Sequence, residues 1–423
     1  MSRSVVVIGG GLAGLVAARH LAAGGADVTL YEADETVGGR VTTHTEAGYT
    51  LDRGFQVLFT AYPAVQRELD LDALDLRRFS PGATIARPGK RSVLADPLGD
   101  PTAALASLRT DEVTTTDKLR TLALRQDLGT RAYDDLLDRP DASIREWLQE
   151  WGFSEQYINN FIAPFYGGIT LDRSLSTSKR VFEYTFKALS DGDSAVPADG
   201  MAAIPKQLAA AAADAGATIH TDEAVTELRE NRRRAVVVTE GDRRAVDAVV
   251  VATPPRPAAR LTGCRSLPTE GVGCVTQHYR LPDADPLDTG QRLLLNAGGA
   301  EPNTVVPMST VAPEYAPDDD LLLNATFLGA AAMDRASEQL AAQTRETLSA
   351  WYPNRSFDRL KPLRTDRIPF AQFAQPPGIH GSLPAVRDGG RRIYLAGEYT
   401  EWSSIQGAMK SGRTAARAVL EDH

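Results

Sequence analysis

The first forty residues constrain the fold more than any other stretch of the chain. Four apolar β-formers at 5–8 run into the glycine cluster 9–11, and an Ala- and Leu-rich segment of helical character follows at 12–23. A second apolar run at 27–31 ends at the acid Glu32. Strand, glycine turn, helix, strand and acid in this order are typical of a βαβ unit that binds a dinucleotide.

The glycines of this turn have separate roles. Gly9 allows the tight turn, Gly11 lets the backbone approach a pyrophosphate, and Gly14 lets the helix pack closely on the strand. The helix N-terminus adds N–H groups and the positive end of a dipole. Glu32 can accept hydrogen bonds from ribose hydroxyls, and its charge repels a 2′-phosphate. We therefore expect FAD or NAD here rather than NADP.

A second glycine motif, Gly38-Gly39-Arg40, follows closely and favours FAD over NAD as the cofactor. It offers another close backbone approach to the diphosphate, with Arg40 available to neutralise charge. The alternative is a plain turn with an exposed arginine.

The end of the chain carries a third motif. A buried strand at 392–396 should deliver Gly397 and Glu398 at its carboxyl end, ahead of a long helix at 404–420. That helix N-terminus would face the pyrimidine edge of a flavin and favour its reduced anion. Glu398 would hydrogen-bond the sugar or ribityl chain, and the small residues Gly407 and Ala408 allow close approach. An ordinary amphipathic helix is the alternative.

Composition excludes several classes of function. The net charge of −9 gives no general attraction for nucleic acid or anionic membrane. Two cysteines without a CxxC spacing predict neither a disulfide framework nor a metal site. We expect no signal peptide, because the first strand starts directly after Met-Ser-Arg, and no transmembrane helix. A cytoplasmic protein is the default expectation, and a lipophilic substrate would be compatible with peripheral membrane contact.

The middle of the chain reads as a substrate-binding half. Residues 102–189 are expected to be largely helical and rich in aromatics, most of them core. Period-two strands between 271 and 327 suggest an antiparallel sheet. A proline and a double glycine among large apolar residues at 161–168 suit a cavity wall, as does the aromatic strand 368–373. The predicted cavity residues are Phe55, Phe161, Phe165, Tyr166, Phe370 and Trp402.

The predicted fold class is α/β with an α+β insertion. Residues 1–75, 195–265 and 385–423 should form a discontinuous, Rossmann-like FAD-binding domain. Residues 76–194 and 266–384 should form a substrate domain of antiparallel sheet and helices.

The two glycine motifs with Glu32, and the segment 394–412, resemble the FAD-dependent amine oxidase and phytoene desaturase superfamily. The C-terminal motif is closest to the carotenoid desaturases, where Asp usually stands at the Glu398 position. The resemblance implies a p-hydroxybenzoate-hydroxylase type of fold, a substrate domain over the flavin, and two-electron oxidation of a C–H or C–N bond. The residues expected to contact FAD are Gly9, Gly11, Leu12, Ala13, Gly14, Glu32, Ala33, Gly39, Arg40, Val225, Thr253, Gly397, Glu398, Ile405, Gly407 and Ala408.

Two absences refine this expectation. Tyr399 and Thr400 stand where covalent amine oxidases attach the flavin through a cysteine, so FAD should be non-covalent. Many amine oxidases also hold a water at flavin N5 with a lysine, and the strand 274–281 that should supply it has none. Both absences favour the desaturase-like branch.

The leading functional hypothesis is therefore a carotenoid or isoprenoid desaturase that passes its electrons to a quinone or to oxygen. A protoporphyrinogen oxidase or amine oxidase relative is the second hypothesis. A non-catalytic prenyl-binding escort of the same fold is the third. The sequence offers no Ser/His/Asp motif, so no catalytic residue is assigned, and it carries no signal for the oligomeric state.

Overall fold

The structure is a computed structural model that describes residues 2–95, 112–299, 301–317 and 320–422. One half of the molecule is built on a parallel five-stranded sheet in the order β10-β2-β1-β14-β20. These strands are β10 (Thr218–His220), β2 (Asp27–Tyr31), β1 (Ser4–Ile8), β14 (Ala248–Val251) and β20 (Ile393–Leu395). The sheet is therefore assembled from three distant parts of the chain, all within the ranges predicted to bind FAD.

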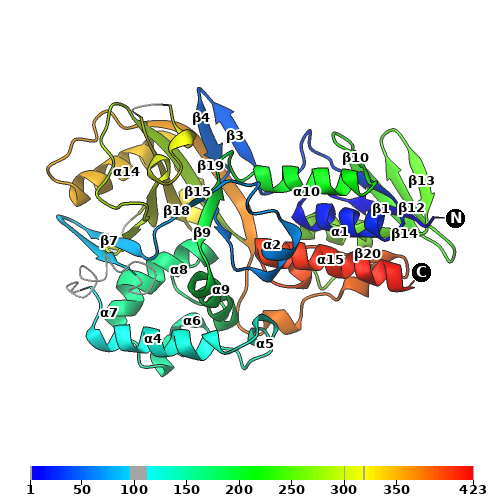
Figure 1. The fold of residues 1–423 in the computed structure, drawn as a ribbon, viewed down its shortest axis with the longest axis horizontal. Coiled ribbons are helices and arrows are strands. Elements are labelled where there is room, and N and C mark those ends of the chain that lie inside the picture. The colour runs from blue at the N-terminus through cyan, green and yellow to red at the C-terminus, as the bar shows by residue number, and fades with distance from the viewer. Residues whose placement is uncertain (1, 96–111, 300, 318–319, 423) are drawn as a thin grey trace.

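Helices cover this sheet. Helix α1 (Leu12–Ala23) packs against both α10 (Ala203–Asp214) and α15 (Ile405–Asp422), and Figure 1 shows the three helices side by side. These helices cover one face of the sheet. The three-stranded sheet β11 (Val225–Glu230), β12 (Ala235–Thr239) and β13 (Arg243–Val246) covers the other face, where Val237 shares a core cluster with Val6 and Val249. The central strand β14, an apolar run, is therefore buried at every position. The N- and C-terminal motifs are thereby brought onto one sheet.

A mixed seven-stranded sheet forms the other half of the molecule, in the order β19-β15-β18-β17-β16-β7-β8. All neighbours are antiparallel except β16 and β7, which are parallel. The helix α14 (Ser337–Trp351) packs against this sheet. The strands are β19 (Lys361–Phe373), β15 (Gly271–Leu281), β18 (Leu321–Leu328), β17 (Thr304–Pro307), β16 (Leu294–Asn296), β7 (Ala83–Arg87) and β8 (Lys90–Leu94).

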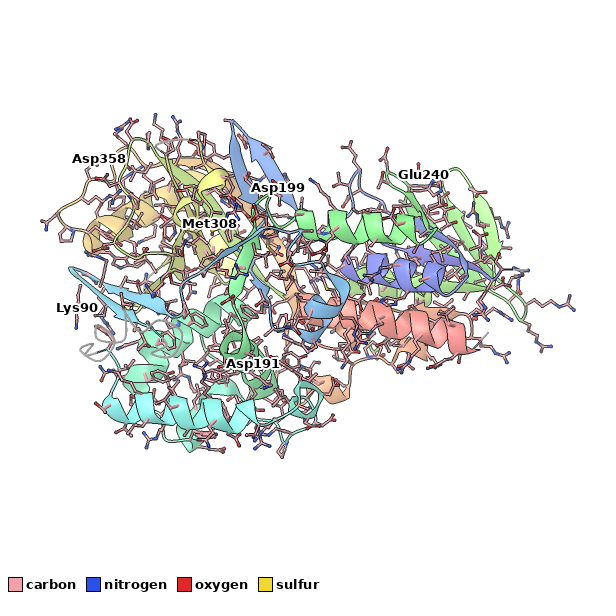
Figure 2. The ribbon with its side chains drawn as sticks, viewed as in Figure 1. Lys90, Asp191, Asp199, Glu240, Met308 and Asp358 are labelled. Carbon is pink, nitrogen blue, oxygen red and sulfur yellow. The ribbon has the colours of Figure 1, made fainter. Side chains whose placement is uncertain are left out.

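The expected antiparallel sheet is thus present but larger than predicted, since the hairpin β7–β8 joins it through a parallel pair. The turn of this hairpin, marked by Lys90, lies at one end of the molecule, and Glu240, between β12 and β13, lies toward the other (Figure 2).

Helices form a layer below the seven-stranded sheet in the view of Figure 1. Ser143 caps one of them, and the Glu146 side chain accepts from the Ser143 N–H to complete a capping box. Residues 102–111 of the predicted helical range lie outside the described residues. The helices are α4 (Thr115–Gly129), α5 (Tyr133–Leu136), α6 (Ile144–Glu150), α7 (Glu155–Tyr157), a π-turn (Ile158–Ile162), α8 (Ala163–Thr170) and α9 (Lys179–Asp191).

Smaller elements connect the halves. The strand β9 (Ser194–Pro197) pairs with both β5 (Leu58–Phe59) and β6 (Leu76–Arg78). No helix of the described ranges has the length and apolar content needed to span a bilayer. The other strands and α-helices are β3 (Thr43–Glu46), β4 (Tyr49–Asp52), β11 (Val225–Glu230), β12 (Ala235–Thr239), β13 (Arg243–Val246), α2 (Pro63–Glu68), α11 (Pro255–Thr262), α12 (Met308–Val311) and α13 (Ala330–Met333).

Candidate active site

A single large cavity of about 1050 Å³ runs between the parallel sheet and the helical layer. It is lined at one end by the N- and C-terminal motifs and at the other by the aromatic middle of the chain. The predicted cofactor region and the predicted substrate region are therefore one continuous space, large for a single ligand site.

The glycine turn has the geometry that its three roles require. Gly9 has φ +105°, and a Cβ there would lie 2.9 Å from the carbonyl oxygen of Ala252. A Cβ on Gly14 would overlap the carbonyl oxygen of Gly9, so helix and strand are packed backbone to backbone. A Cβ on Gly11, by contrast, would meet nothing within 4 Å, and Gly11 lines the cavity. Gly11 is thus the point where a diphosphate can approach the backbone.

Glu32 lies at the end of β2, where it faces both the cavity and the turn. Its Oε2 accepts a hydrogen bond of 2.6 Å from the Gly10 N–H, and its Oε1 accepts one of 2.9 Å from the Asp34 N–H. The side chain is buried and held in one position. Because each carboxylate oxygen has a second lone pair, Glu32 can still accept from ribose hydroxyls while it braces the glycine turn.

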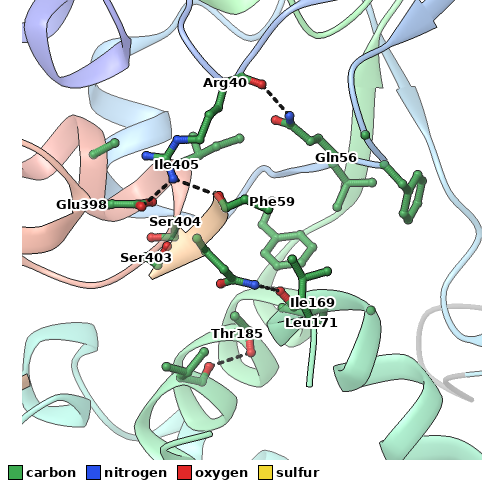
Figure 3. A pocket seen from close by; sticks show the side chains of 18 of the residues that line it. Arg40, Gln56, Phe59, Ile169, Leu171, Thr185, Glu398, Ser403, Ser404 and Ile405 are labelled. Atoms are coloured by element: carbon green, nitrogen blue, oxygen red, sulfur yellow. Dashed lines mark hydrogen bonds and ion pairs between the residues drawn. The ribbon is translucent and has the colours of Figure 1, made fainter. Parts of the chain in front are cut away.

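The second and third motifs meet through an ion pair. Arg40 Nη1 donates to Glu398 Oε1 at 2.6 Å and to the Ala371 carbonyl at 2.9 Å, as Figure 3 shows. Gln56 donates to the Arg40 carbonyl at 2.8 Å. The sequence predicts that Arg40 neutralises a diphosphate. In the structure its guanidinium neutralises Glu398, and both side chains line the cavity.

The C-terminal helix begins at the cavity. Ser404, Ile405 and Ala408 line it, so the positive end of the α15 dipole faces the cofactor space (Figure 3). A Cβ on Gly407 would overlap the Trp402 carbonyl oxygen, so that glycine serves packing. The Gly397 N–H donates to Ser411 Oγ at 2.8 Å, which fixes the turn between β20 and the helix.

Most of the residues predicted to contact FAD line this one cavity. Gly14 and Gly407 pack elements against one another and do not line the cavity. The predicted cofactor residues that line it are Gly9, Gly11, Leu12, Ala13, Glu32, Ala33, Gly39, Arg40, Val225, Thr253, Gly397, Glu398, Ile405 and Ala408.

The substrate end is walled by aromatic rings. Phe161 stacks on Phe165 with ring centroids 5.5 Å apart, and Phe165 meets Tyr166 at the same separation. Phe55 and Trp402 also line the cavity. Phe370 does not line the cavity and packs against Gly271 instead. The pairing of β19 with β15 is irregular between Val272 and Cys274, so the alternation of side chains is broken there and Phe370 does not share the cavity side with Ile368 and Gln372.

Sequence reasoning missed several lining residues, among them Gln56, Cys274 and Ile368. Strand patterning could have placed Cys274 and Ile368, which pair across β15 and β19. Burial, with a smaller effect from Asp366, raises the pKa of the Cys274 thiol to about 12. The thiol is therefore neutral at pH 7.

The residues present fit an FAD molecule. Gly11 leaves the space that a diphosphate needs, Glu32 presents an acceptor to a ribose, and the start of α15 offers a positive dipole end to a flavin ring. Together they make up the three parts of a dinucleotide site.

Comparison with known proteins also points to a flavin-binding protein. The family described as "Flavin containing amine oxidoreductase" matches residues 12–420. A phytoene dehydrogenase of Streptomyces griseus is 30% identical over 61% of this chain and 56% of its own length. The 15-cis-phytoene desaturase of Glycine max is 25% identical over 99% of this chain and 80% of its own.

Fold similarity extends over the whole chain. A structure from Exiguobacterium sp. 255-15 that carries the name protoporphyrinogen oxidase superposes with a TM-score of 0.75 at 17% identity, and covers 100% of both chains. With the family match across nearly all of its length, this chain belongs to the flavin-containing amine oxidoreductases and is an FAD-dependent oxidoreductase.

Proposed function

We propose that this enzyme desaturates a lipophilic isoprenoid, most directly a carotenoid or a carotenoid precursor. The observation that carries the proposal is the continuity of the FAD site with a long cavity of mainly apolar and aromatic side chains. The named relatives phytoene dehydrogenase and phytoene desaturase support the same substrate class. An amine oxidase would need to accommodate a polar nitrogen in this cavity, and β15 carries no lysine to hold a water at the flavin.

The chain's own residues would bind, orient and exclude water. Bound FAD supplies a two-electron acceptor for a hydride from a substrate carbon. Glu32 and the glycine turn would hold its adenosine half, and Glu398, fixed by Arg40, its sugar chain. Phe161, Phe165 and the rings around them would keep the reacting carbon in a water-free slot.

We also infer the finer architecture. The pieces 1–75, 195–265 and 385–423 would form an FAD-binding domain of the p-hydroxybenzoate-hydroxylase type, and the rest a substrate domain. FAD would be non-covalent, since 397–402 contains no cysteine. A quinone or oxygen would reoxidise it.

An anaerobic substrate panel tests this function. The holoenzyme is mixed separately with phytoene, squalene, protoporphyrinogen, benzylamine and a polyamine, and the absorption of oxidised flavin is followed. We expect an isoprenoid alone to bleach the flavin. Bleaching by an amine alone would make the enzyme an amine oxidase, and bleaching by protoporphyrinogen alone a protoporphyrinogen oxidase.

The purified protein itself tests the non-catalytic alternative. A yellow protein that bleaches with dithionite carries redox-active flavin. A colourless protein that releases no flavin on heating would instead support a prenyl-binding escort.

A further inference from the structure

The two faces of the seven-stranded sheet differ in polarity. The face that packs against α14 is mainly apolar, and its side chains share a core cluster with those of the helix. Val275 and Ala325 lie on that face, so the next residues along their strands point to the other one, toward the cavity. This other face is also buried, yet it carries the polar residues Thr276, His278, Thr304, Asn324, Thr326 and Asp366.

Four of these residues form one row across four adjacent strands, which we call the polar row. Thr304 on β17 pairs with Thr326 on β18, Thr326 pairs with Thr276 on β15, and Thr276 pairs with Asp366 on β19. Directly opposite residues share a face, with Cβ atoms roughly 4.5–5.5 Å apart. Rotation about χ1 can bring neighbouring hydroxyls within hydrogen-bond distance at that separation, and cross-strand threonine pairs often bond in this way.

Every member of the polar row has a buried polar atom that makes no hydrogen bond within the described part of the chain. These atoms are Oγ1 of Thr276, Thr304 and Thr326, and Oδ2 of Asp366. The four residues are between 0% and 6% exposed, so solvent does not replace the missing partners. Buried polar groups without partners oppose folding. Four of them in one row therefore indicate a role other than stability.

The polar row leads out of the cavity. Thr304 and Thr326 line the cavity, whereas Thr276 and Asp366 do not. A row that only contacted a substrate would need no polar side chain at these two inner positions. The continuation of the row beyond the cavity wall therefore favours transport along it.

The inner end of the row is a carboxylate with one oxygen available. Arg364 Nε donates to Asp366 Oδ1 at 2.9 Å, and His278 Nε2 lies 4.0 Å from Oδ2. Oδ2 therefore remains an acceptor for the Thr276 hydroxyl. The Arg364 side chain is 33% exposed, so Asp366 lies between the cavity and the surface.

We propose that the polar row carries the proton that the substrate loses from the cavity to Asp366. This route rests on the proposed function, in which a double bond forms. One C–H bond gives its electron pair and hydrogen to bound FAD as a hydride. The adjacent C–H bond then breaks, its electron pair becomes the new π bond, and a proton remains.

Threonine hydroxyls can pass this proton, because a hydroxyl accepts at a lone pair and donates its own hydrogen. The carbon next to a cation loses its proton readily once the hydride has left, so a neutral hydroxyl suffices as the first acceptor. The proton enters at Thr304 or Thr326, passes Thr276 and ends on Asp366 Oδ2, where the carboxylate becomes a carboxylic acid.

The melting temperature of the apoprotein separates this role from a structural one. Thr276→Val and Thr326→Val each replace an unpartnered hydroxyl with a methyl group of the same shape. We expect both apoproteins to melt at or above the wild-type temperature, since a cost of folding is removed. Lower melting temperatures would show that these hydroxyls serve folding, and would overturn the proposal.

The rate of anaerobic flavin bleaching tests the transport. Thr276→Val and Asp366→Asn should slow bleaching by substrate at least about tenfold, the lower end of what a proton-transfer group contributes. Thr276→Ser, which keeps the hydroxyl, should restore most of the rate. Bleaching by dithionite needs no proton from a substrate and should be unchanged in every variant.

Thr84→Val is the matched control. Thr84 on β7 is another buried threonine whose hydroxyl has no partner, but it pairs with Leu294 of the apolar face and does not line the cavity. This variant should bleach at the wild-type rate.

Infrared difference spectra follow the proton itself. Reduction of the wild-type holoenzyme by substrate should produce a carboxylic acid C=O band that is absent from Asp366→Asn and weaker in Thr276→Val. Reduction by dithionite should produce no such band. A substrate-induced band that persists in Asp366→Asn would place the proton elsewhere and overturn the proposal.

Two kinetic results would also overturn it. One is a wild-type rate in both Thr276→Val and Asp366→Asn. The other is a loss confined to Thr304→Val and Thr326→Val, which would make these two hydroxyls a contact for an oxygen of the substrate. The variants are compared with whichever compound of the panel bleaches the flavin, since each loses a proton with its hydride. Phytoene that leaves the flavin oxidised would therefore reject the proposed substrate and leave the test of the polar row in place.

Discussion

At the scale of single residues, two carboxylates are fixed at the end of the cavity where we propose that FAD binds. Glu32 accepts hydrogen bonds from the N–H groups of Gly10 and Asp34, so it stabilises the glycine turn before any cofactor binds. Glu398 is almost fully buried and is neutralised by Arg40, a residue from the opposite end of the chain. Each carboxylate therefore has a structural partner as well as a predicted cofactor partner.

Replacing Glu32 with alanine should weaken FAD binding by roughly 1–3 kcal/mol, or about 5- to 150-fold in Kd, the scale of a lost charge-assisted hydrogen bond. The loss has two sources, since the ribose acceptor and the brace of the turn are removed together. Titration of apoenzyme with FAD measures the change. Glu35→Ala, an exposed acid in the same loop, is the control and should bind like the wild type. Unchanged FAD affinity of Glu32→Ala would remove this residue from the site.

At the scale of elements, the glycine turn separates packing from binding. Gly14 holds α1 against β1, because any side chain there would overlap the backbone of Gly9. No atom lies within 4 Å of the position that a Cβ on Gly11 would take, and this open space belongs to the cavity. The same motif thus contains one glycine that the packing of the apoprotein requires and one beside which we propose that the cofactor lies.

Replacing each of these two glycines with alanine, which adds one methyl group, measures this difference. Gly11→Ala should leave the melting temperature of the apoprotein unchanged, since φ is −73° and no atom is close, but weaken FAD binding by about tenfold or more where the diphosphate approaches. Gly14→Ala should destabilise the apoprotein itself by forcing α1 away from β1. Thermal unfolding of the two apoproteins, followed by FAD titration, distinguishes them. Equal melting temperatures, or normal FAD binding by Gly11→Ala, would contradict these roles.

At the scale of the whole molecule, a buried histidine joins the two halves. His278 on β15 contacts the Asp52 carbonyl on β4 at 3.0 Å. Burial lowers its pKa to about 4, although Asp366 on β19 opposes the shift; Arg364 on β19 and His44 on β3 add to it. The folded protein therefore keeps His278 neutral in a pH range where the unfolded chain protonates it.

The sign of the pH effect follows from this lowered pKa. Above pH 6.5 the histidine is neutral in both states, and as pH falls from 6.5 to 4 only the unfolded chain gains the proton. The free energy of unfolding should therefore fall by about 3 kcal/mol, through His278 alone, as the pH falls over that range. Urea unfolding of wild type and His278→Gln at several pH values measures it: the variant should show the shallower dependence. Parallel curves would show that His278 does not titrate this way.

Much of the site could be predicted from sequence because its motifs are local. A glycine turn and its acid lie within a few tens of residues, and their backbone requirements fix residue types. The pairing of Arg40 with Glu398 and the parallel pairing of β7 with β16 join segments hundreds of residues apart, and nothing local encodes them. Phe370 shows the same limit, since the bulged pairing of β19 with β15 decides which of its side chains reach the cavity.

The most direct test of the central claim is a single anaerobic turnover with phytoene. Holoenzyme in excess is mixed with the substrate, the flavin absorption is followed, and the product is analysed by mass spectrometry. We expect one flavin reduced for each double bond formed, with a product two hydrogen atoms lighter than the substrate. Phytoene recovered unchanged beside fully oxidised flavin, while an amine from the same panel bleaches the flavin, would show that the enzyme is not a carotenoid desaturase.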